Sequence, residues 1–145
     1  MTDNLKIKAT RYHDICMGHR VVGHEGKCRH LHGHNYRFTF HCEAVELDCI
    51  GRVIDFSVIK TTLCEWLESH WDHKMMLWKD DPFLLTVCKE DPEGVVIVPF
   101  NPTAENIATH FIENVAPTLL PCNVKLTKLV LEETRKCSVE VDKES

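Results

Sequence analysis

The sequence predicts a single α+β domain in which a four-stranded antiparallel sheet carries two helices on one face. Two segments near each end of the chain alternate apolar and polar residues, as half-buried strands do. Two amphipathic helical stretches lie between these pairs of strands. Strands that flank the helices, rather than alternating with them, favour an antiparallel sheet. The predicted order over residues 1–145 is therefore ββααββ, with no linker or internal repeat to divide the chain.

The composition is that of an ordinary globular protein. The chain has 145 residues, enough for one adequate core, of which 43% are hydrophobic and 27% charged. No apolar run approaches the ~18–20 residues of a membrane span, so we expect no membrane partner. The formal net charge of −5 argues against a nucleic-acid partner. The first four residues lack the features of a signal peptide, so we expect a cytoplasmic protein whose eight cysteines are reduced.

The first pair of strands is expected to meet at a histidine. Residues 5–13 alternate and continue toward Met17, and the strand ends at His19. Residues 20–31 form a loop, and residues 35–47 form the clearest strand. Four apolar side chains share one face of that second strand: Phe38, Phe40, Cys42 and Ala44. Antiparallel pairing of the two strands would bring His19 back toward the start of the second.

Two helices should follow. Asp55 is the expected N-cap of the first helix, because its carboxylate can accept free backbone N–H groups, and this helix should stop near Ser69. Thr103 is the expected N-cap of the second helix, which Pro117 and Pro121 should end.

The rest of the chain closes the sheet. Residues 74–94 show no clear period, and residues 95–98 form a short buried strand or an extended segment. Two further strands are expected at about 123–133 and 136–142, with a turn near Thr134 and Arg135. The apolar surface left on the sheet face away from the helices favours self-association.

His32 and His34 are the first candidates for chemistry. In an extended chain they point to the same side, and Gly33 between them lets another backbone or a ligand approach. A zinc site needs a third ligand. His19 is the best placed, and His30, which has the same parity as His32, is a rival. Three histidines with one open position form the catalytic pattern of zinc.

Cys28 is the thiol nearest to these histidines in the sequence. Neighbouring cations lower the pKa of a thiol, and Lys27, Arg29 and a bound metal all lie close in sequence. Three interpretations stay open: a base or nucleophile, a fourth ligand that completes a structural Cys-His₃ site in a non-catalytic domain, or a plain loop cysteine. Arg20 and Lys74 either add to a local positive field or are solvated surface charges.

Two further positions carry carboxylates that chemistry could use. Asp72 can orient the adjacent His73 as a proton shuttle, although the same pair is also an ordinary ending for a surface helix. Glu133 has the strand parity of Leu129 and Leu131, and an acid on an apolar face needs a partner. A carboxylate can accept two parallel N–H bonds from an amidine edge such as that of a pterin ring. The alternative is an exposed strand end.

Six motifs in one order carry a family resemblance. They are Gly18-His19, Cys28-x-x-x-His32-Gly33-His34-Asn35-Tyr36, Val53-Ile54-Asp55-Phe56, Asp72-His73-Lys74, Asn101-Pro102-Thr103-Ala104-Glu105-Asn106 and Glu133-Thr134. From about residue 8 to residue 141, the chain resembles the family of 6-pyruvoyl-tetrahydropterin synthases and the 6-carboxytetrahydropterin synthases of queuosine biosynthesis. The resemblance implies a tunnelling fold (T-fold) in a homo-oligomer, commonly a hexamer, with active sites at subunit interfaces.

The resemblance also implies a role for each candidate residue. His19, His32 and His34 are implied as ligands of Zn²⁺, and Cys28 as the general base.

The remaining roles concern proton transfer and the pterin. Asp72 and His73 are implied as a proton relay that a neighbouring chain supplies. Glu133 is implied as the acid that anchors the pterin, and Thr103 as a helper at the pterin edge.

The spacing before the His-Gly-His triplet points to the product. The substrate class implied by the resemblance is 7,8-dihydroneopterin triphosphate, a small-molecule partner. The pyruvoyl enzymes of tetrahydrobiopterin synthesis resemble C-x-x-x-x-x-H-G-H, whereas the carboxy enzymes resemble C-x-x-x-H-G-H, as here. We therefore expect a zinc-dependent lyase that forms 6-carboxy-5,6,7,8-tetrahydropterin and releases acetaldehyde and triphosphate. The alternative is 6-pyruvoyl-tetrahydropterin synthase, which only eliminates triphosphate.

Overall fold

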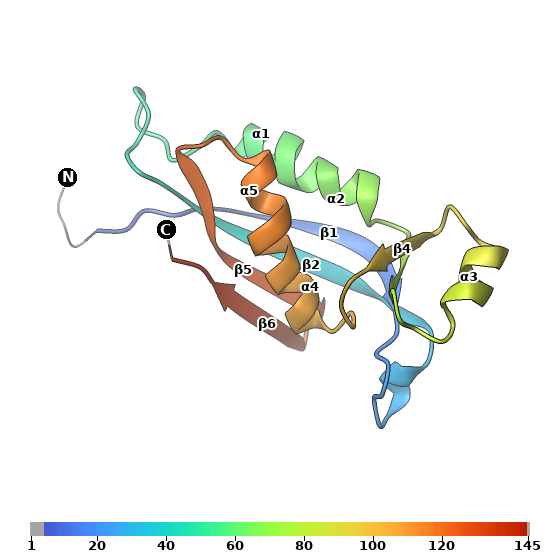
Figure 1. Cartoon of the computed structure of the whole chain (residues 1–145). Coiled ribbons are helices and arrows are strands. Elements are labelled where there is room, and N and C mark those ends of the chain that lie inside the picture. Colours follow the sequence, from blue (N-terminus) through green and yellow to red (C-terminus); the bar gives the residue numbers. More distant parts are fainter. Residues whose placement is uncertain (1–4, 145) are drawn as a thin grey trace.

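The computed structural model describes residues 5–144, and it contains the four predicted strands within a larger sheet (Figure 1). These strands are β1 (Ala9–His19), β2 (His32–Ala44), β5 (Val124–Thr134) and β6 (Cys137–Asp142). They pair antiparallel in the order β1-β2-β5-β6. Alternation of apolar and polar residues was enough to predict all four, because each has one face on the core.

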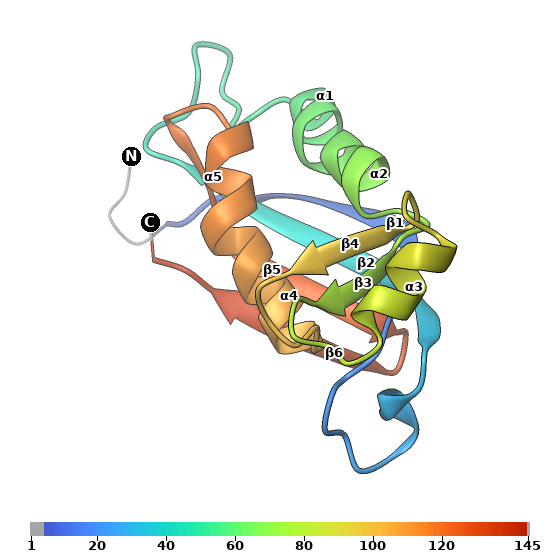
Figure 2. The same cartoon turned by 45° about the vertical axis from the view of Figure 1, so that its right-hand side comes forward.

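The prediction that the sheet has only four, wholly antiparallel strands is wrong. Over the described residues the sheet has six strands, in the order β4-β3-β1-β2-β5-β6. The short strands β3 (Met75–Trp78) and β4 (Val95–Val98) run parallel to β1 and to each other. Four apolar residues are too few to show a period, and Met75 to Trp78 are apolar throughout, so the sequence pattern gave no strand there. The helix α3 (Leu84–Glu90) connects β3 to β4 (Figure 2).

The first predicted helix lies across one face of the sheet (Figures 1 and 2). Asp55 caps it as expected, since its carboxylate accepts a hydrogen bond from the Ser57 N–H at 2.9 Å. A π-helical turn interrupts it, so it consists of three segments: α1 (Phe56–Ile59), η2 (Lys60–Cys64) and α2 (Glu65–His70).

The second helix lies on the same face, and it ends at Leu119, between the two prolines Pro117 and Pro121 that were expected to end it (Figure 1). Proline offers no N–H and crowds the carbonyl four residues before it. The turn before Pro117 is π-helical, and its Ala116 N–H donates to the carbonyl of Phe111, five residues back. This wider turn gives the proline room. The three segments are α4 (Ala104–His110), η3 (Phe111–Val115) and α5 (Ala116–Leu119).

The core lies between the sheet and these two helices, and it fixes the strand that carries two of the candidate histidines. Tyr36, Phe38 and Phe40 on β2 are fully buried. The ring of Phe111 lies 5.6 Å from that of Phe38 and 5.7 Å from that of Phe40, between ring centroids. His34 continues this inward face toward the start of β2. None of the described helices is long and apolar enough to cross a membrane.

Candidate metal centre and active site

Three histidines meet where β1 ends and β2 begins. The register pairs His19 with His32 across the two strands, and His34 follows on the same face. The ligand atoms of the three side chains all lie within 4.8 Å of one another. His30 is exposed and does not belong to this group, but its carbonyl accepts a hydrogen bond from His32 Nδ1 at 2.7 Å. The strand pairing thus selects His19 over His30 as the third member.

The hydrogen bonds of the rings leave three nitrogen atoms free to bind a cation. Nδ1 of His19 donates to the carbonyl of Pro102, and Nδ1 of His32 donates to the carbonyl of His30, each at 2.7 Å. A neutral ring that donates from Nδ1 keeps its lone pair on Nε2. The Nε2 atoms of His19, His32 and His34 are buried and have no hydrogen-bond partner. Buried acceptors without partners are costly, so the cluster fits a divalent metal ion that accepts three imidazole ligands.

Burial also favours the neutral form of His19 and His34, which a metal ligand must adopt. Burial lowers the pKa of His19 to about 4. It lowers the pKa of His34 as well, although the carboxylate of Glu133 acts in the opposite direction. Near neutral pH both rings are therefore neutral, and in His19 the hydrogen bond from Nδ1 leaves the lone pair at Nε2.

Glu133 reaches the cluster from the far end of β5. Leu129 and Leu131 on the same strand face are fully buried, and a register irregularity between Glu132 and Thr134 lies where Glu133 projects. Glu133 Oε2 is 3.6 Å from His34 Nε2, and a quarter of its side chain is exposed. The carboxylate is thus partly open to a ligand beside the histidines.

Cys28 lies beside the cluster but is not a member of the group of close ligand atoms. It occupies a short 3₁₀ turn, η1 (Lys27–Arg29), and its carbonyl accepts a hydrogen bond from the Val21 N–H at 2.8 Å. The pKa of the Tyr36 phenol is raised, mainly by burial and further by the nearby Glu133 and Cys28. Cys28 is therefore near the cluster without belonging to its set of close ligand atoms.

Arg20 holds the Cys28 loop in place, a role that the sequence analysis did not assign. Instead of being a solvated charge, it is buried, and its Nε donates to Asp81 Oδ2 at 2.8 Å. Its Nη1 donates to the carbonyl of Arg29 at 2.7 Å, directly after Cys28. The guanidinium also lies 3.8 Å from the centre of the Phe83 ring. Asp81 and Phe83 belong to the stretch in which the sequence showed no pattern, so no sequence signal indicated this contact.

The segment before α4 supports both the loop and the cluster. The side chain of Asn101 exchanges two hydrogen bonds of 2.9 Å with the backbone of Val22. The next residue, Pro102, provides the carbonyl that orients His19. Thr103 follows, and its hydroxyl accepts a hydrogen bond from the first turn of α4 as the helix N-cap. Its O–H remains available to donate to a ligand.

Asp72 and His73 form a hydrogen-bonded pair at the edge of β1. Asp72 Oδ2 is 2.8 Å from His73 Nδ1, and Asp72 Oδ1 accepts from the Cys16 N–H at 2.9 Å. Burial acts to raise the pKa of Asp72, but these hydrogen bonds outweigh it and the pKa is lowered. The carboxylate is therefore ionised and can orient the imidazole of His73, which is three-quarters exposed.

Among the described residues, neither Asp72 nor His73 makes a hydrogen bond to the histidine cluster. The histidine side chains have the strand parity of Met17 and Tyr36, which face the core under the helices. His73 instead lines a hollow of about 530 Å³ on the open side of the sheet. Residues of both strand faces line this hollow: Cys16, Gly18, Gly33 and Asn35 from the open face, and Met17 and His34 from the face that carries the cluster.

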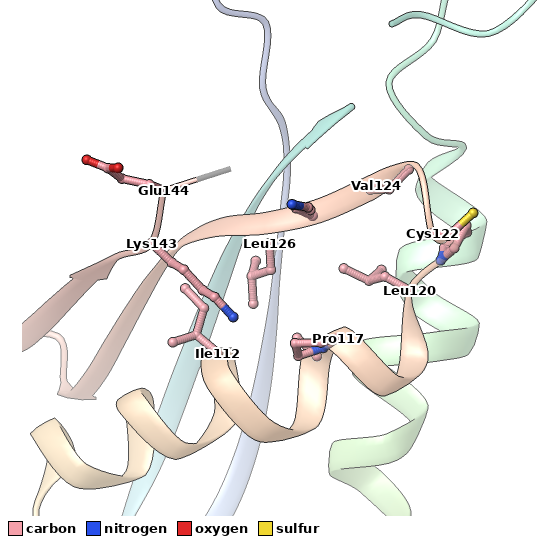
Figure 3. A pocket seen from close by; sticks show the side chains of 11 residues that line it. Ile112, Pro117, Leu120, Cys122, Val124, Leu126, Lys143 and Glu144 are labelled. Carbon is pink, nitrogen blue, oxygen red and sulfur yellow. The ribbon is translucent and has the colours of Figure 1, made fainter. Parts of the chain in front are cut away.

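A second hollow, of about 300 Å³, lies between α5 and β5 (Figure 3). Its walls are mainly apolar, with Ile112, Pro117 and Leu126 facing the space and Lys143 at its side. None of the predicted site residues lines it. It belongs to the end of the sheet remote from the histidines, where β5 begins.

Comparison with known proteins places the chain in one group. The family model described as 6-pyruvoyl tetrahydropterin synthase matches residues 8–144. Proteins named 6-carboxy-5,6,7,8-tetrahydropterin synthase from Rickettsia typhi and Rickettsia felis are 39% and 38% identical to it over 137 residues, 93% of this chain and 99% of theirs.

Solved structures show the same fold. An uncharacterized protein from Wolinella succinogenes superimposes with a TM-score of 0.85 at 26% identity, over 97% of this chain and 100% of that one. The 6-pyruvoyl tetrahydropterin synthase of Caenorhabditis elegans gives a TM-score of 0.69 at 22% identity, over 99% and 100% of the two chains. The second likeness is one of fold alone.

Proposed function

Because the chain belongs to the 6-pyruvoyl tetrahydropterin synthase family, we propose that it is a lyase of the 6-carboxytetrahydropterin synthase type. It converts 7,8-dihydroneopterin triphosphate and water into 6-carboxy-5,6,7,8-tetrahydropterin, acetaldehyde and triphosphate, a reaction of the queuosine pathway. The names of the relatives that match nearly end to end support this product, as does the three-residue gap between Cys28 and His32.

The observation that carries the proposal is the set of three buried imidazoles whose Nε2 atoms have no partner. His19, His32 and His34 would hold Zn²⁺, which three histidines with an open position suit. When bound, the zinc ion supplies Lewis-acid chemistry toward the hydroxyl groups of the substrate side chain.

Glu133 and Thr103 would bind the pterin ring. The Glu133 carboxylate is partly exposed beside His34 and can accept two parallel N–H bonds from the amidine edge of the ring. The free O–H of Thr103 can donate to the same edge, since only its oxygen is engaged in capping α4.

Cys28 would act as the general base and take a proton from a side-chain carbon of the substrate. The pair of Asp72 and His73 would return a proton elsewhere on the molecule. Because this pair makes no hydrogen bond to the cluster of its own chain and His73 is three-quarters exposed, we assign it to the active site of a neighbouring subunit. The protein would then work as a homo-oligomer, of which a hexamer is the form we favour.

Product analysis tests the proposal. The zinc-loaded protein is incubated with 7,8-dihydroneopterin triphosphate, and the products are identified by mass spectrometry together with an assay for acetaldehyde. We expect 6-carboxytetrahydropterin and acetaldehyde in equal amounts. Triphosphate without acetaldehyde would instead indicate a 6-pyruvoyl-tetrahydropterin synthase. Absence of both products would favour a non-catalytic domain with a structural zinc site.

A further inference from the structure

Tyr36 adds a fourth unpartnered polar atom to the histidine cluster. Over residues 5–144, the buried side-chain polar atoms that lack a hydrogen-bond partner are the three histidine Nε2 atoms and the Tyr36 hydroxyl. Tyr36 follows His34 by two residues on β2, so its side chain lies on the same strand face. Its ring centroid is 5.7 Å from that of His19 and 5.5 Å from that of His34, in edge-on contacts. The four side chains that carry these atoms therefore lie in one cluster.

Core packing does not explain this hydroxyl. Tyr36 has no exposed surface, and Phe38 and Phe40 fill the next two inward positions of the same strand. A phenylalanine at position 36 would fill the same space without the cost of burying a hydroxyl that has no partner. The hydroxyl thus calls for a ligand that supplies its partner.

The hydroxyl of Tyr36 and the three histidine nitrogens suit different kinds of ligand atom. Three lone pairs suit a cation, whereas an O–H group can donate to an oxygen atom. Glu133 of β5 and Cys28 of η1 lie near enough to raise the pKa of the hydroxyl further, beyond the larger effect of burial. It therefore lies among the groups assigned to the pterin ring, the proton transfer and the metal.

We propose that Tyr36 is a further catalytic residue, whose hydroxyl donates a hydrogen bond to an oxygen of the substrate's hydroxylated side chain. The substrate class rests on the function proposed above. As the side-chain alcohol becomes a carbonyl, Cys28 takes the proton of its C–H bond, and the electron pair of that bond passes to the C6=N5 bond of the substrate's own dihydropterin ring. The ring takes up two protons and is reduced to the tetrahydro level, while the hydroxyl proton is lost to solvent. Negative charge develops on the side-chain oxygen during this transfer, and a donor already fixed in place stabilises that charge. Tyr36 keeps its proton throughout, and Cys28 remains the base.

The test compares Tyr36→Phe with Tyr12→Phe. Tyr12 lies on the opposite face of β1 and is exposed, with its ring against the guanidinium of Arg37. Three quantities are measured for the zinc-loaded proteins: zinc affinity by competition with a chelator, the Kd values of neopterin and of pterin without a side chain, and kcat. Neopterin serves as the probe because its oxidised ring does not react.

For Tyr36→Phe we expect a zinc affinity within about twofold of the wild type, and neopterin binding weaker by roughly tenfold. Binding of pterin should be unchanged, because that ligand lacks the side chain. We expect kcat to fall by roughly 10²-fold, as when a preorganised donor is removed from a developing oxyanion. Tyr12→Phe should match the wild type in all three measurements.

Two results with the variant would overturn the inference. A loss of zinc affinity of tenfold or more would make Tyr36 a metal ligand, and wild-type values for both neopterin and kcat would make it a packing residue. If the proposed function itself is wrong, the wild-type protein will show it, and not only the variant. A wild-type protein that neither turns over nor prefers neopterin to pterin would overturn that function, and this inference with it.

Discussion

Acidification should destabilise the metal-free protein through His19. Its pKa is lowered from 6.5 to about 4 by burial, so the unfolded state takes up a proton before the folded state does. The stability that depends on the neutral ring is fully present above pH 6.5, and it is lost as the pH falls from 6.5 toward 4. Between about pH 7.5 and about pH 4.5 this single group should remove about 2.5 kcal/mol from the free energy of unfolding.

The assay is urea unfolding of the apoprotein at the two pH values, at one protein concentration. Other groups also titrate in this range, so the control is His19→Gln, whose amide can still donate to the carbonyl of Pro102. We expect the wild type to lose about 2.5 kcal/mol more than the variant. An NMR titration of the His19 ring gives an independent check. Equal losses in the two proteins, or a ring that titrates near 6.5, would refute the buried neutral imidazole.

Five further variants test the remaining assignments. Cys28→Ala should keep zinc but lose turnover by at least about 10²-fold, because it removes a base and no ligand; loss of zinc in a metal assay would contradict this role. Glu133→Ala should raise the Kd for pterin by roughly tenfold or more, as expected for lost hydrogen bonds to a charged group, and an unchanged Kd would exclude it as the anchor. Arg20→Met leaves the buried Asp81 carboxylate without its cation and should lower the free energy of unfolding by about 3–5 kcal/mol. Arg37→Met, which breaks a partly exposed ion pair, should cost far less, and similar losses for the two variants in urea unfolding would show that Arg20 anchors nothing. Finally, inactive Cys28→Ala and His73→Ala proteins should regain activity when they are mixed and reassembled, whereas continued inactivity would place both residues in the site of one subunit.

The sequence was most informative where one strand face meets the core. Alternation predicted β1 and β2, and their antiparallel pairing then brought His19 toward His32 without further information. The same parity argument placed Glu133 on the face of Leu129 and Leu131.

Contacts between distant segments were beyond the reach of sequence patterns. Arg20 and Asp81 are 61 positions apart, and no period links them, so the burial of Arg20 could not be predicted. The position of His73 depends on the edge where β3 joins β1, and β3 was too short to predict. Tyr36 was recognised only as part of a motif, because a missing hydrogen-bond partner is visible only in the folded chain.

Acetaldehyde release that depends on restored metal tests the central claim most directly. The purified protein is stripped with a chelator, and acetaldehyde formation from 7,8-dihydroneopterin triphosphate is measured before and after addition of one zinc ion per chain. We expect no release from the apoprotein and release that saturates at one equivalent of zinc, with a matching amount of 6-carboxytetrahydropterin. Acetaldehyde formed equally well by the stripped protein, or none formed after zinc is restored, would contradict a zinc-dependent lyase built on His19, His32 and His34.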